Sequence, residues 1–430
     1  MMSMSEAAFE DPTESLEILM NTYFDKNKAM LLVRAKANPD TKDIDGKPLL
    51  HKLFEIGTHD EIRELILIWK GDINITDSKG KTALQYQLKN KNLSPGDINL
   101  FAELKADFNV TDENGDSVIV NLSLLNHQKF NDVVYQILIQ HQAKAILSND
   151  FTSIDTTKIS FEKELGSGAF ATVFFGRWNK EEVATKIFPV DEKNFARQLK
   201  NYSQEVKILS MLTNVPNIIG FKGHNISHYH IVFEYAEKGS LEDLIKSGLI
   251  LSWDLRYEMA KEIIIGLDGM HKKDILHRDI KSGNILVTTD NHAKIADFGS
   301  ATTKMIRYRD LVGTPAYQAP ECMFGPFYSE KTDVYSFSRI VLEIIYWQNL
   351  NNLIPKNFLV SYKEIKTDVS KFNDKEYMKN FYDEVRNFSK LTLPKDCPNS
   401  FTLFAPCFEY SSSKRAHADE IVEKFECKLG

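Results

Sequence analysis

The chain has 430 residues, of which 43% are hydrophobic and 26% charged, and a formal net charge of −7 at pH 7. This length exceeds one ordinary hydrophobic core, so two or three globular domains are expected. The negative charge argues against nucleic acid as the main partner. No apolar run reaches the roughly 18 residues of a membrane span, and the acidic start lacks the pattern of a secretory leader, so we expect no transmembrane segment and a cytoplasmic location.

The first third of the chain contains a weak internal repeat. Three Asp-x-x-Gly turns end at Gly46, Gly80 and Gly115, 34 and 35 residues apart. Glycine tolerates positive φ at such a tip, and the aspartate can accept a hydrogen bond from the backbone two residues on. This period belongs to stacked helical repeats. Lys47–His51 and Lys81–Leu84, after the first two turns, resemble the opening of an ankyrin repeat.

The resemblance implies an all-α ankyrin solenoid over residues 1–150 that recognises a protein partner. A degenerate fourth unit is expected at Gln128–Ser148, because terminal repeats meet solvent on one face. A generic helical domain with coincidental turns is the alternative. The polar segment 149–158 lacks helical periodicity, so we place the boundary to a second domain, 159–430, within it.

The second domain begins with short β-branched and aromatic runs. Ala171–Phe175 and Val183–Phe188 predict two strands of an antiparallel sheet, and Ile231–Tyr235 predicts another strand. Phe195–Leu212 spaces its apolar residues at helical intervals and predicts one long helix. Helical patterns dominate beyond Ser240. The fold class expected is therefore α+β.

The most informative stretch runs from His277 to Asn284 and is followed by Asp297-Phe298-Gly299. It offers a carboxylate, Asp279, for a nucleophilic hydroxyl, and the amide of Asn284 and the carboxylate of Asp297 for metals that bridge phosphates. Upstream lie a glycine-containing loop and Lys186. Together these motifs resemble a eukaryotic-type protein kinase of the serine/threonine, tyrosine-kinase-like group, with a layout similar to ankyrin-repeat, integrin-linked-type kinases.

The resemblance implies a bilobal fold with an antiparallel small lobe and a mainly helical large lobe, and it implies ATP and Mg²⁺ as cofactors. Asp279 would accept the substrate's hydroxyl proton, Lys281 would neutralise the γ-phosphoryl charge, and Lys186 would pair with Glu205. Asn284 and Asp297 would hold the metals. The residues expected around the nucleotide are Leu165, Gly166, Ser167, Gly168, Ala169, Phe170, Ala171, Thr172, Val173, Ala184, Lys186, Glu234, Ala236 and Leu286.

The sequence between Lys281 and Asn284 favours serine or threonine over tyrosine as acceptor, because tyrosine kinases carry a different pattern there. Gly313–Glu321 resembles the end of an activation segment. The family pattern further implies that Glu321 pairs with Arg415 and that Asp333 anchors the catalytic loop.

Arg278 is typical of kinases that are switched by phosphorylation of the activation segment. Candidate acceptors in this segment are Thr302, Thr303 and Tyr308. Its basic residues, Lys304, Arg307 and Arg309, could instead recognise an acidic substrate or remain solvated.

Two other functions are compatible with the same motifs. One is an ankyrin-pseudokinase scaffold, against which the complete set of charged and amide residues argues. The other is a kinase-fold enzyme that phosphorylates a lipid or a small molecule, against which the Gly313–Glu321 segment argues. Abundant Asn, Lys, Ile and Phe are compatible with a protist or with an intracellular bacterium, whose delivered protein would act in the host-cell cytoplasm. The four scattered cysteines are expected to be reduced thiols, with neither disulfides nor zinc.

Overall fold

The computed structural model describes residues 11–56, 59–87, 95–111, 117–118, 120, 153–168, 170–189, 195–303, 313–323, 328–353 and 393–426. The chain divides into two compact units, Met1–Asp150 with Val190–Ser203, and Phe151–Pro189 with Gln204–Gly430. Within the described ranges, no helix combines the length and the apolar character needed to cross a bilayer.

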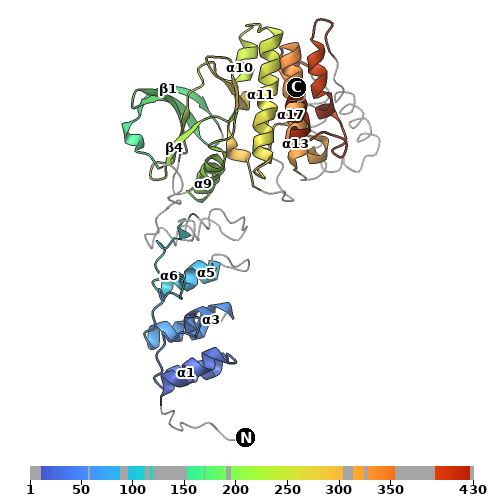
Figure 1. Cartoon of the computed structure of the whole chain (residues 1–430). Coiled ribbons are helices and arrows are strands. Elements are labelled where there is room, and N and C mark those ends of the chain that lie inside the picture. The colour runs from blue at the N-terminus through green and yellow to red at the C-terminus, as the bar shows by residue number, and fades with distance from the viewer. Residues whose placement is uncertain are drawn as a thin grey trace, which may run out of the picture. The chain divides into compact units, whose positions relative to one another are not determined.

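The first unit consists of short helices arranged in successive layers (Figure 1). An aspartate caps the N-terminus of each of the first two helices. The Asp11 carboxylate accepts hydrogen bonds from the N–H groups of Thr13 and Glu14, and the Asp25 carboxylate accepts from the corresponding two N–H groups of the second helix. The helices are α1 Pro12–Asn21, α2 Lys26–Arg34, α3 Leu49–Glu55, α4 His59–Arg63 with the π-helical turn η1 Glu64–Ile68, α5 Ala83–Gln87 and α6 Pro95–Glu103.

The turns between layers repeat with the period seen in the sequence. Isolated β-bridges close them at Lys42 and Pro48, at Thr76 and Thr82, and at Thr111 and Ser117. Gly46 and Gly80 have φ of 77° and 73°, as predicted for these tips. The carboxylates of Asp43 and Asp77 accept from the backbone two residues on, at 3.1 and 2.9 Å. The tip of the third turn, 112–116, and the expected fourth unit, Gln128–Ser148, lie outside the described residues.

Neighbouring layers are joined by equivalent hydrogen bonds. The N–H of Asp72 donates to the Asp40 carboxylate of the preceding turn at 2.8 Å, and one layer further the N–H of Asp107 donates to Asn74 Oδ1 at 2.8 Å. Between the layers the rings of Phe54 and Phe101 stack with centroids 4.4 Å apart. The unit is therefore held by repeated turn-to-turn bonds and by apolar contacts between layers.

The second unit begins with a five-stranded antiparallel sheet in the order β1-β2-β3-β5-β4. Its strands are β1 Ser160–Ser167, β2 Thr172–Trp178, β3 Glu181–Ile187, β4 Phe221–Asn225 and β5 His230–Glu234. Helix α9, Phe195–Leu212, has the predicted bounds and follows β3 in the chain.

The segment that precedes β1 packs onto this sheet. Ser153 forms a parallel bridge with His224 on β4, and the N–H of Ile154 donates to the His224 carbonyl at 2.9 Å. Ile154 is buried in a cluster that also contains Ile159, Val183 and Val232. The compact unit thus starts ahead of Ile159, and residues 153–158 are part of it.

The remainder of this unit is mainly helical, and α11, α13 and α17 pack against one another (Figure 1). Most residues of α13 are buried, and Phe337 on it packs against Phe404 at 5.6 Å between ring centroids. The elements are α10 Leu241–Lys246, α11 Trp253–His271, η3 Ser282–Asn284, β6 Ile285–Val287, β7 Ala293–Ile295, η4 Phe298–Ser300, η5 Pro315–Tyr317, α12 Pro320–Met323, α13 Glu330–Tyr346, α14 Leu350–Leu353, η7 Asn399–Phe408 and α17 Ala418–Glu426.

The predicted α+β class is confirmed, with an antiparallel sheet first and helices after it. Two short strands, β6 and β7, lie between Asp279 and Asp297 and pair with each other. Cys322, Cys397 and Cys407 are free thiols and buried, and Cys427 lies outside the described residues.

Candidate active site

Gly166 at the end of β1 and Gly168 in the loop that follows have room for a side chain. A Cβ added to Gly166 would meet no atom of the described residues within 4 Å, and one added to Gly168 would meet only the Ala171 carbonyl at 3.7 Å. Neither glycine is among those with positive φ. The backbone at both glycines is therefore open to close approach by another group. Ala169, within this loop, lies outside the described residues.

Lys186 on β3 meets two carboxylates. Its Nζ lies 2.8 and 2.9 Å from the two oxygens of Glu205 on α9 and 2.8 Å from Asp297 Oδ1. The Lys186 side chain is 14% exposed and that of Glu205 only 1%. Burial lowers the pKa of Lys186, but the two carboxylates outweigh burial and raise it. Burial raises the pKa of Glu205 against the effect of the ammonium.

Asp297 follows β7 in a left-handed conformation, with φ of 60°. The preceding Ala296 is bound on both sides, since its N–H donates to the Asn284 carbonyl at 2.9 Å and its carbonyl faces His277 Nε2 at 3.0 Å. Phe298, the next residue, is fully buried. The Lys186 ammonium lowers the pKa of Asp297 to about 2. The aspartate is therefore ionised and held next to Lys186.

Three polar side chains converge at Asp279. Lys281 Nζ donates to its Oδ2 at 2.8 Å, and the Thr314 hydroxyl donates to its Oδ1 at 2.8 Å. Asn284 Nδ2 donates to the Asp279 carbonyl at 2.8 Å, which leaves the amide oxygen of Asn284 as a possible metal ligand. Lys281 also contacts the Thr314 hydroxyl at 3.2 Å. The arrangement places a carboxylate, an ammonium and an amide within one hydrogen-bonded group.

Asp333 on α13 holds the backbone that carries Asp279. Its carboxylate accepts from the N–H groups of His277 and Arg278, both at 2.9 Å, and contacts His271 Nε2 at 3.2 Å. Burial by itself would raise the pKa of Asp333, but the bonds from the histidines outweigh it and lower the pKa. The anchoring role expected from the sequence is what the structure shows, and His271 is an additional partner.

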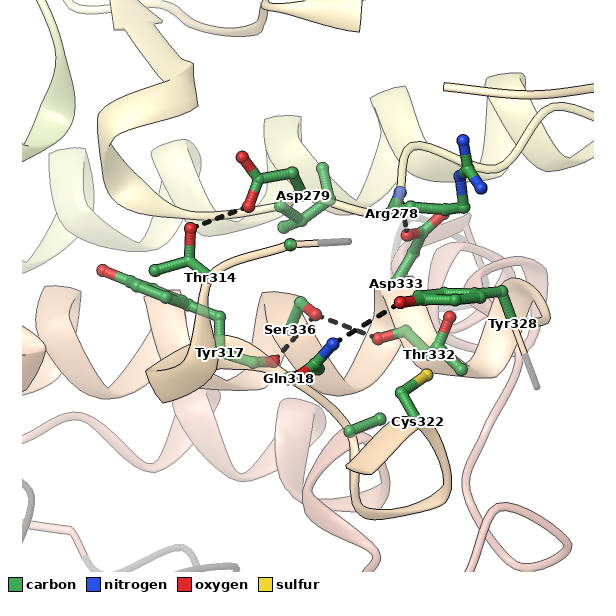
Figure 2. A pocket seen from close by; sticks show the side chains of 13 residues that line it. Arg278, Asp279, Thr314, Tyr317, Gln318, Cys322, Tyr328, Thr332, Asp333 and Ser336 are labelled. Atoms are coloured by element: carbon green, nitrogen blue, oxygen red, sulfur yellow. Dashed lines mark hydrogen bonds between the residues drawn. The ribbon is translucent and has the colours of Figure 1, made fainter. Parts of the chain in front are cut away.

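A pocket lies between the loop that carries Asp279 and the Gly313–Glu321 segment (Figure 2). Asp279 and Thr314 form one end, where Figure 2 shows their hydrogen bond, and Cys322 and Tyr328 lie at the other. The other lining residues are Arg278, Ile280, Gly313, Tyr317, Gln318, Ala319, Thr332, Asp333 and Ser336.

Comparison with known proteins agrees with this geometry. Residues 159–425 match the family model of the protein kinase domain. The chain belongs to the protein kinase family. The kinase domain of this chain therefore contains the whole sheet, the ion pair and the Asp279 group described above.

The similarity between this chain and known proteins extends beyond that domain. The chain is 28% identical over 420 residues to a probable serine/threonine-protein kinase of Dictyostelium discoideum, covering 92% of this chain and 24% of the relative. Two putative serine/threonine-protein kinase/receptors of Acanthamoeba polyphaga mimivirus are each 30% identical, one over 374 residues (84% of this chain, 21% of the relative) and the other over 305 residues (69% and 17%). The chain thus spans less than a quarter of the length of these relatives.

Of the segment between Asp297 and Glu321, the structure describes the two ends, 297–303 and 313–321. Arg278 Nε donates to the Ser300 carbonyl at 2.6 Å. Gly313 has φ of 98°, and a Cβ there would lie 2.6 Å from the Arg278 carbonyl, so this position needs glycine. Thr302 pairs with Leu276 through both of its backbone groups. Tyr308 and the three basic residues nearby lie outside the described residues.

Glu321 and Arg415 form the predicted pair. Arg415 Nη1 and Nη2 lie 2.6 and 3.2 Å from the two oxygens of Glu321, and the Arg415 side chain is fully buried. The guanidinium also donates to the carbonyls of Glu409, Lys331 and Tyr410. This bridge ties the end of the activation segment to the C-terminal part of the domain.

The expected adenine end of the kinase site follows β5. The N–H of Ala236 has no acceptor among the described residues. The segment after it lies along β6, because Lys238 N–H donates to the Val287 carbonyl at 3.1 Å and Ser240 bridges Leu286. The Glu234 carboxylate instead accepts from the Gly220 N–H at 2.8 Å and from Lys294, and the Glu234 N–H donates to the Gly220 carbonyl at 2.8 Å.

The structure adds three polar residues that the motifs did not indicate. Ser282 and Tyr317 lie in segments recognised for other reasons, and Glu343 lies on α13 ten positions after Asp333. Their hydroxyl and carboxyl groups contact one another below the Asp279 group. The one signal in the sequence is the single charged residue, Glu343, within the apolar run Ile340–Ile345.

Proposed function

We propose that the chain is an ATP-dependent serine/threonine protein kinase. The observation that carries this proposal is the group around Asp279, where a carboxylate, the Lys281 ammonium and the Thr314 hydroxyl share hydrogen bonds of 2.8 to 3.2 Å. In this group Asp279 can accept and orient a substrate hydroxyl that takes the place of Thr314. Lys281 can then neutralise charge on the transferred phosphoryl group.

The residues present fit a nucleotide with magnesium. The backbone at Gly166 is open to phosphates, and Lys186, held between two carboxylates, can bind their oxygens. Asn284 and Asp297 would hold the metal, whose contribution is to neutralise charge on the phosphates. The described residues contain no group of three or more His, Cys, Asp or Glu suited to a metal.

Two observations support a protein hydroxyl as acceptor. The relatives named above carry the words serine/threonine-protein kinase in their names. The Gly313–Glu321 segment, with Thr314 at Asp279, forms a surface beside the catalytic loop on which a peptide could lie. The resemblance to the tyrosine-kinase-like group agrees with this assignment.

The test is phosphoryl transfer by the purified full-length protein, with magnesium and labelled ATP, to a mixed protein extract. Mapping of the modified sites should give serine and threonine. Asp279→Asn is the matched inactive control, because it keeps the size and most hydrogen bonds of the side chain. Label on lipid or small molecules alone, or equal labelling by both proteins, would refute the proposal.

We further propose that the first unit is an ankyrin-type module that binds a protein partner. Its support is the recurrence of bridge, glycine and aspartate in successive turns, and the equivalent bonds between layers. A fragment that begins at Phe151 retains Ser153 and Ile154 for the sheet and should phosphorylate a generic basic protein. A second fragment that begins at Ile159 lacks those contacts and should unfold at a lower temperature. A folded but inactive first fragment would contradict the independence of the two functions.

A further inference from the structure

Lys186 has a third neighbour besides its two carboxylates, the aromatic ring of Phe188. The Lys186 Nζ lies over the face of this ring, 5.5 Å from its centroid. Both groups are largely shielded from water, since the Lys186 side chain is 14% exposed and Phe188 is 3% exposed. An ammonium at this distance from a ring face is attracted by the π electrons, and more strongly where water is excluded. The ring therefore adds to the attraction that holds Lys186.

The geometry of the strand accounts for this contact. Lys186 is the penultimate residue of β3, and Phe188 follows the strand directly. Residues two positions apart in an extended chain point to the same face of a sheet. Backbone pairing continues as far as Phe188, because Ile187 pairs with His230 and the Phe188 N–H donates to the Tyr229 carbonyl at 3.1 Å. The backbone that carries the ring is thus fixed beside Lys186.

The ring differs from the two carboxylates in the cations that it can bind. Asp297 contacts Lys186 and is also a proposed ligand of magnesium. A carboxylate that binds a metal ion attracts a nearby ammonium less, because the two positive charges repel each other. Magnesium takes oxygen ligands, so the ring of Phe188 keeps its attraction for the ammonium. Phe188 is therefore a neighbour of Lys186 whose attraction does not depend on a metal.

Burial alone does not explain an aromatic residue at position 188. A position with 3% exposure requires an apolar side chain, and an aliphatic one would also meet that requirement. Only an aromatic side chain presents a negative face to the ammonium. Filling of apolar space and attraction of the charge give different results when the ring keeps its shape and loses electron density.

We propose that Phe188 is a positioning residue for the nucleotide: the face of its ring holds the Lys186 ammonium at the place where the ammonium meets phosphate oxygens. Held by the ring and by Glu205, Lys186 keeps this place when Asp297 binds a metal. The proposal rests on the proposed function, since the phosphates are those of the bound nucleotide.

The experiment replaces Phe188 of the full-length protein by phenylalanines that carry one, two or three fluorine atoms. Fluorine withdraws electron density from the ring face at nearly constant shape, which weakens the attraction of a cation step by step. The dissociation constant of a fluorescent ATP analogue, measured with magnesium, should rise with each added fluorine. Phe188→Leu, which has no ring, should raise it by about threefold to thirtyfold.

The matched control is the same fluorinated series at Phe174. This residue lies on β2 opposite Thr185, so it points to the face of the sheet away from Lys186. Its ring contacts that of Phe161, with centroids 6.0 Å apart. Fluorine at Phe174 should leave the dissociation constant of the ATP analogue unchanged.

Urea unfolding without nucleotide gives a second reading that needs neither metal nor activity. Fluorine at Phe188 should lower the urea concentration at the unfolding midpoint when Lys186 is present, and should leave it unchanged in the Lys186→Met background. Equal shifts of the midpoint in both backgrounds, or a nucleotide affinity that does not follow the number of fluorine atoms, would each overturn the proposal. A wild type that does not bind the ATP analogue refutes the proposed function instead, and the unfolding midpoints then decide on the ring. If Phe188→Leu does not fold, the fluorinated series decides by the same readings.

Discussion

Removal of the Lys186 charge tests the buried group that connects β3, α9 and Asp297. In Lys186→Met the Glu205 carboxylate, 1% exposed, loses the cation at 2.8 Å. Breaking a buried pair by removing one partner costs about 3–5 kcal/mol. Because burial already raises the pKa of Glu205, the stranded carboxylate should take up a proton, and the cost should be smaller at low pH.

Whether a second substitution, Glu205→Gln, raises or lowers the stability of the fold then depends on which residue stands at position 186. In wild type, Glu205→Gln takes one carboxylate from Lys186 and should destabilise the fold. In the Lys186→Met background it removes the stranded charge and should restore about 1–3 kcal/mol, the range of coupling energies between contacting residues. The double variant should therefore be more stable than Lys186→Met alone, most clearly at high pH.

The assay is urea unfolding of the full chain for the four members of the cycle, beside kcat/KM for ATP. Each single variant should lose about a hundredfold to a thousandfold in kcat/KM, as when a group that stabilises developing charge is removed. The double variant should lose no more than Lys186→Met.

A matched control is Glu162→Gln, which breaks an exposed pair with Arg177 in the same sheet. Its effect on unfolding should be below about 1 kcal/mol. Additive changes through the cycle, or a Glu205→Gln effect of the same sign in both backgrounds, would refute the reasoning.

Asp279→Asn should abolish phosphoryl transfer and leave nucleotide binding near the wild-type value. Asp297→Asn should also weaken the magnesium-dependent binding of a fluorescent ATP analogue, because Asp297, unlike Asp279, contacts Lys186. Arg415→Met should lower the free energy of unfolding by about 3 kcal/mol in urea, since it strands the carboxylate of Glu321 and three carbonyls; a loss no larger than that of an exposed pair would contradict this. Burial raises the pKa of Glu343 to about 7, so the folded state keeps a proton that the unfolded state loses near pH 4, and this stabilisation disappears as the pH rises to 7. Glu343→Gln should thus gain on wild type by up to about 3 kcal/mol between pH 5 and 7, and parallel pH curves would rule this out.

Regular patterns in the sequence predicted the long elements and the motif residues. Helix α9 has the predicted bounds because its apolar residues keep one helical face. Asp279, Asn284 and Asp297 were expected together, and β6 and β7 bring them to one end of the small sheet. Motif spacing works here because short strands fix the distance between the residues they carry.

Elements without a periodic pattern were not predictable. Every residue of β1 is exposed, so it has no alternation of apolar and polar side chains. β4 contains a glycine and a histidine, Gly223 and His224, and its one large apolar residue is Phe221. Residues 153–158 look like a linker, yet they pack because Ile154 is buried against Val183 and Val232, which are distant in sequence.

The contacts of Tyr317 with Ser282 and Glu343 were not predictable either, because only the tertiary structure brings these residues together. Local sequence carries information on propensity and turns. It carries little on which buried polar groups become neighbours.

The contact between Lys186 and Asp297 has a consequence for how the proposed divalent cation would enter. With a pKa of about 2, Asp297 carries no proton near neutrality, and the group at its oxygen is an ammonium. Asp297 would therefore hold a metal ion without first losing a proton, in place of the Lys186 ammonium, and the Asn284 amide carries no acidic proton. Sites built from histidine or cysteine compete with protons for their metal. Here the competition is between two cations, so metal affinity would follow the position of Lys186 and hardly respond to acidity.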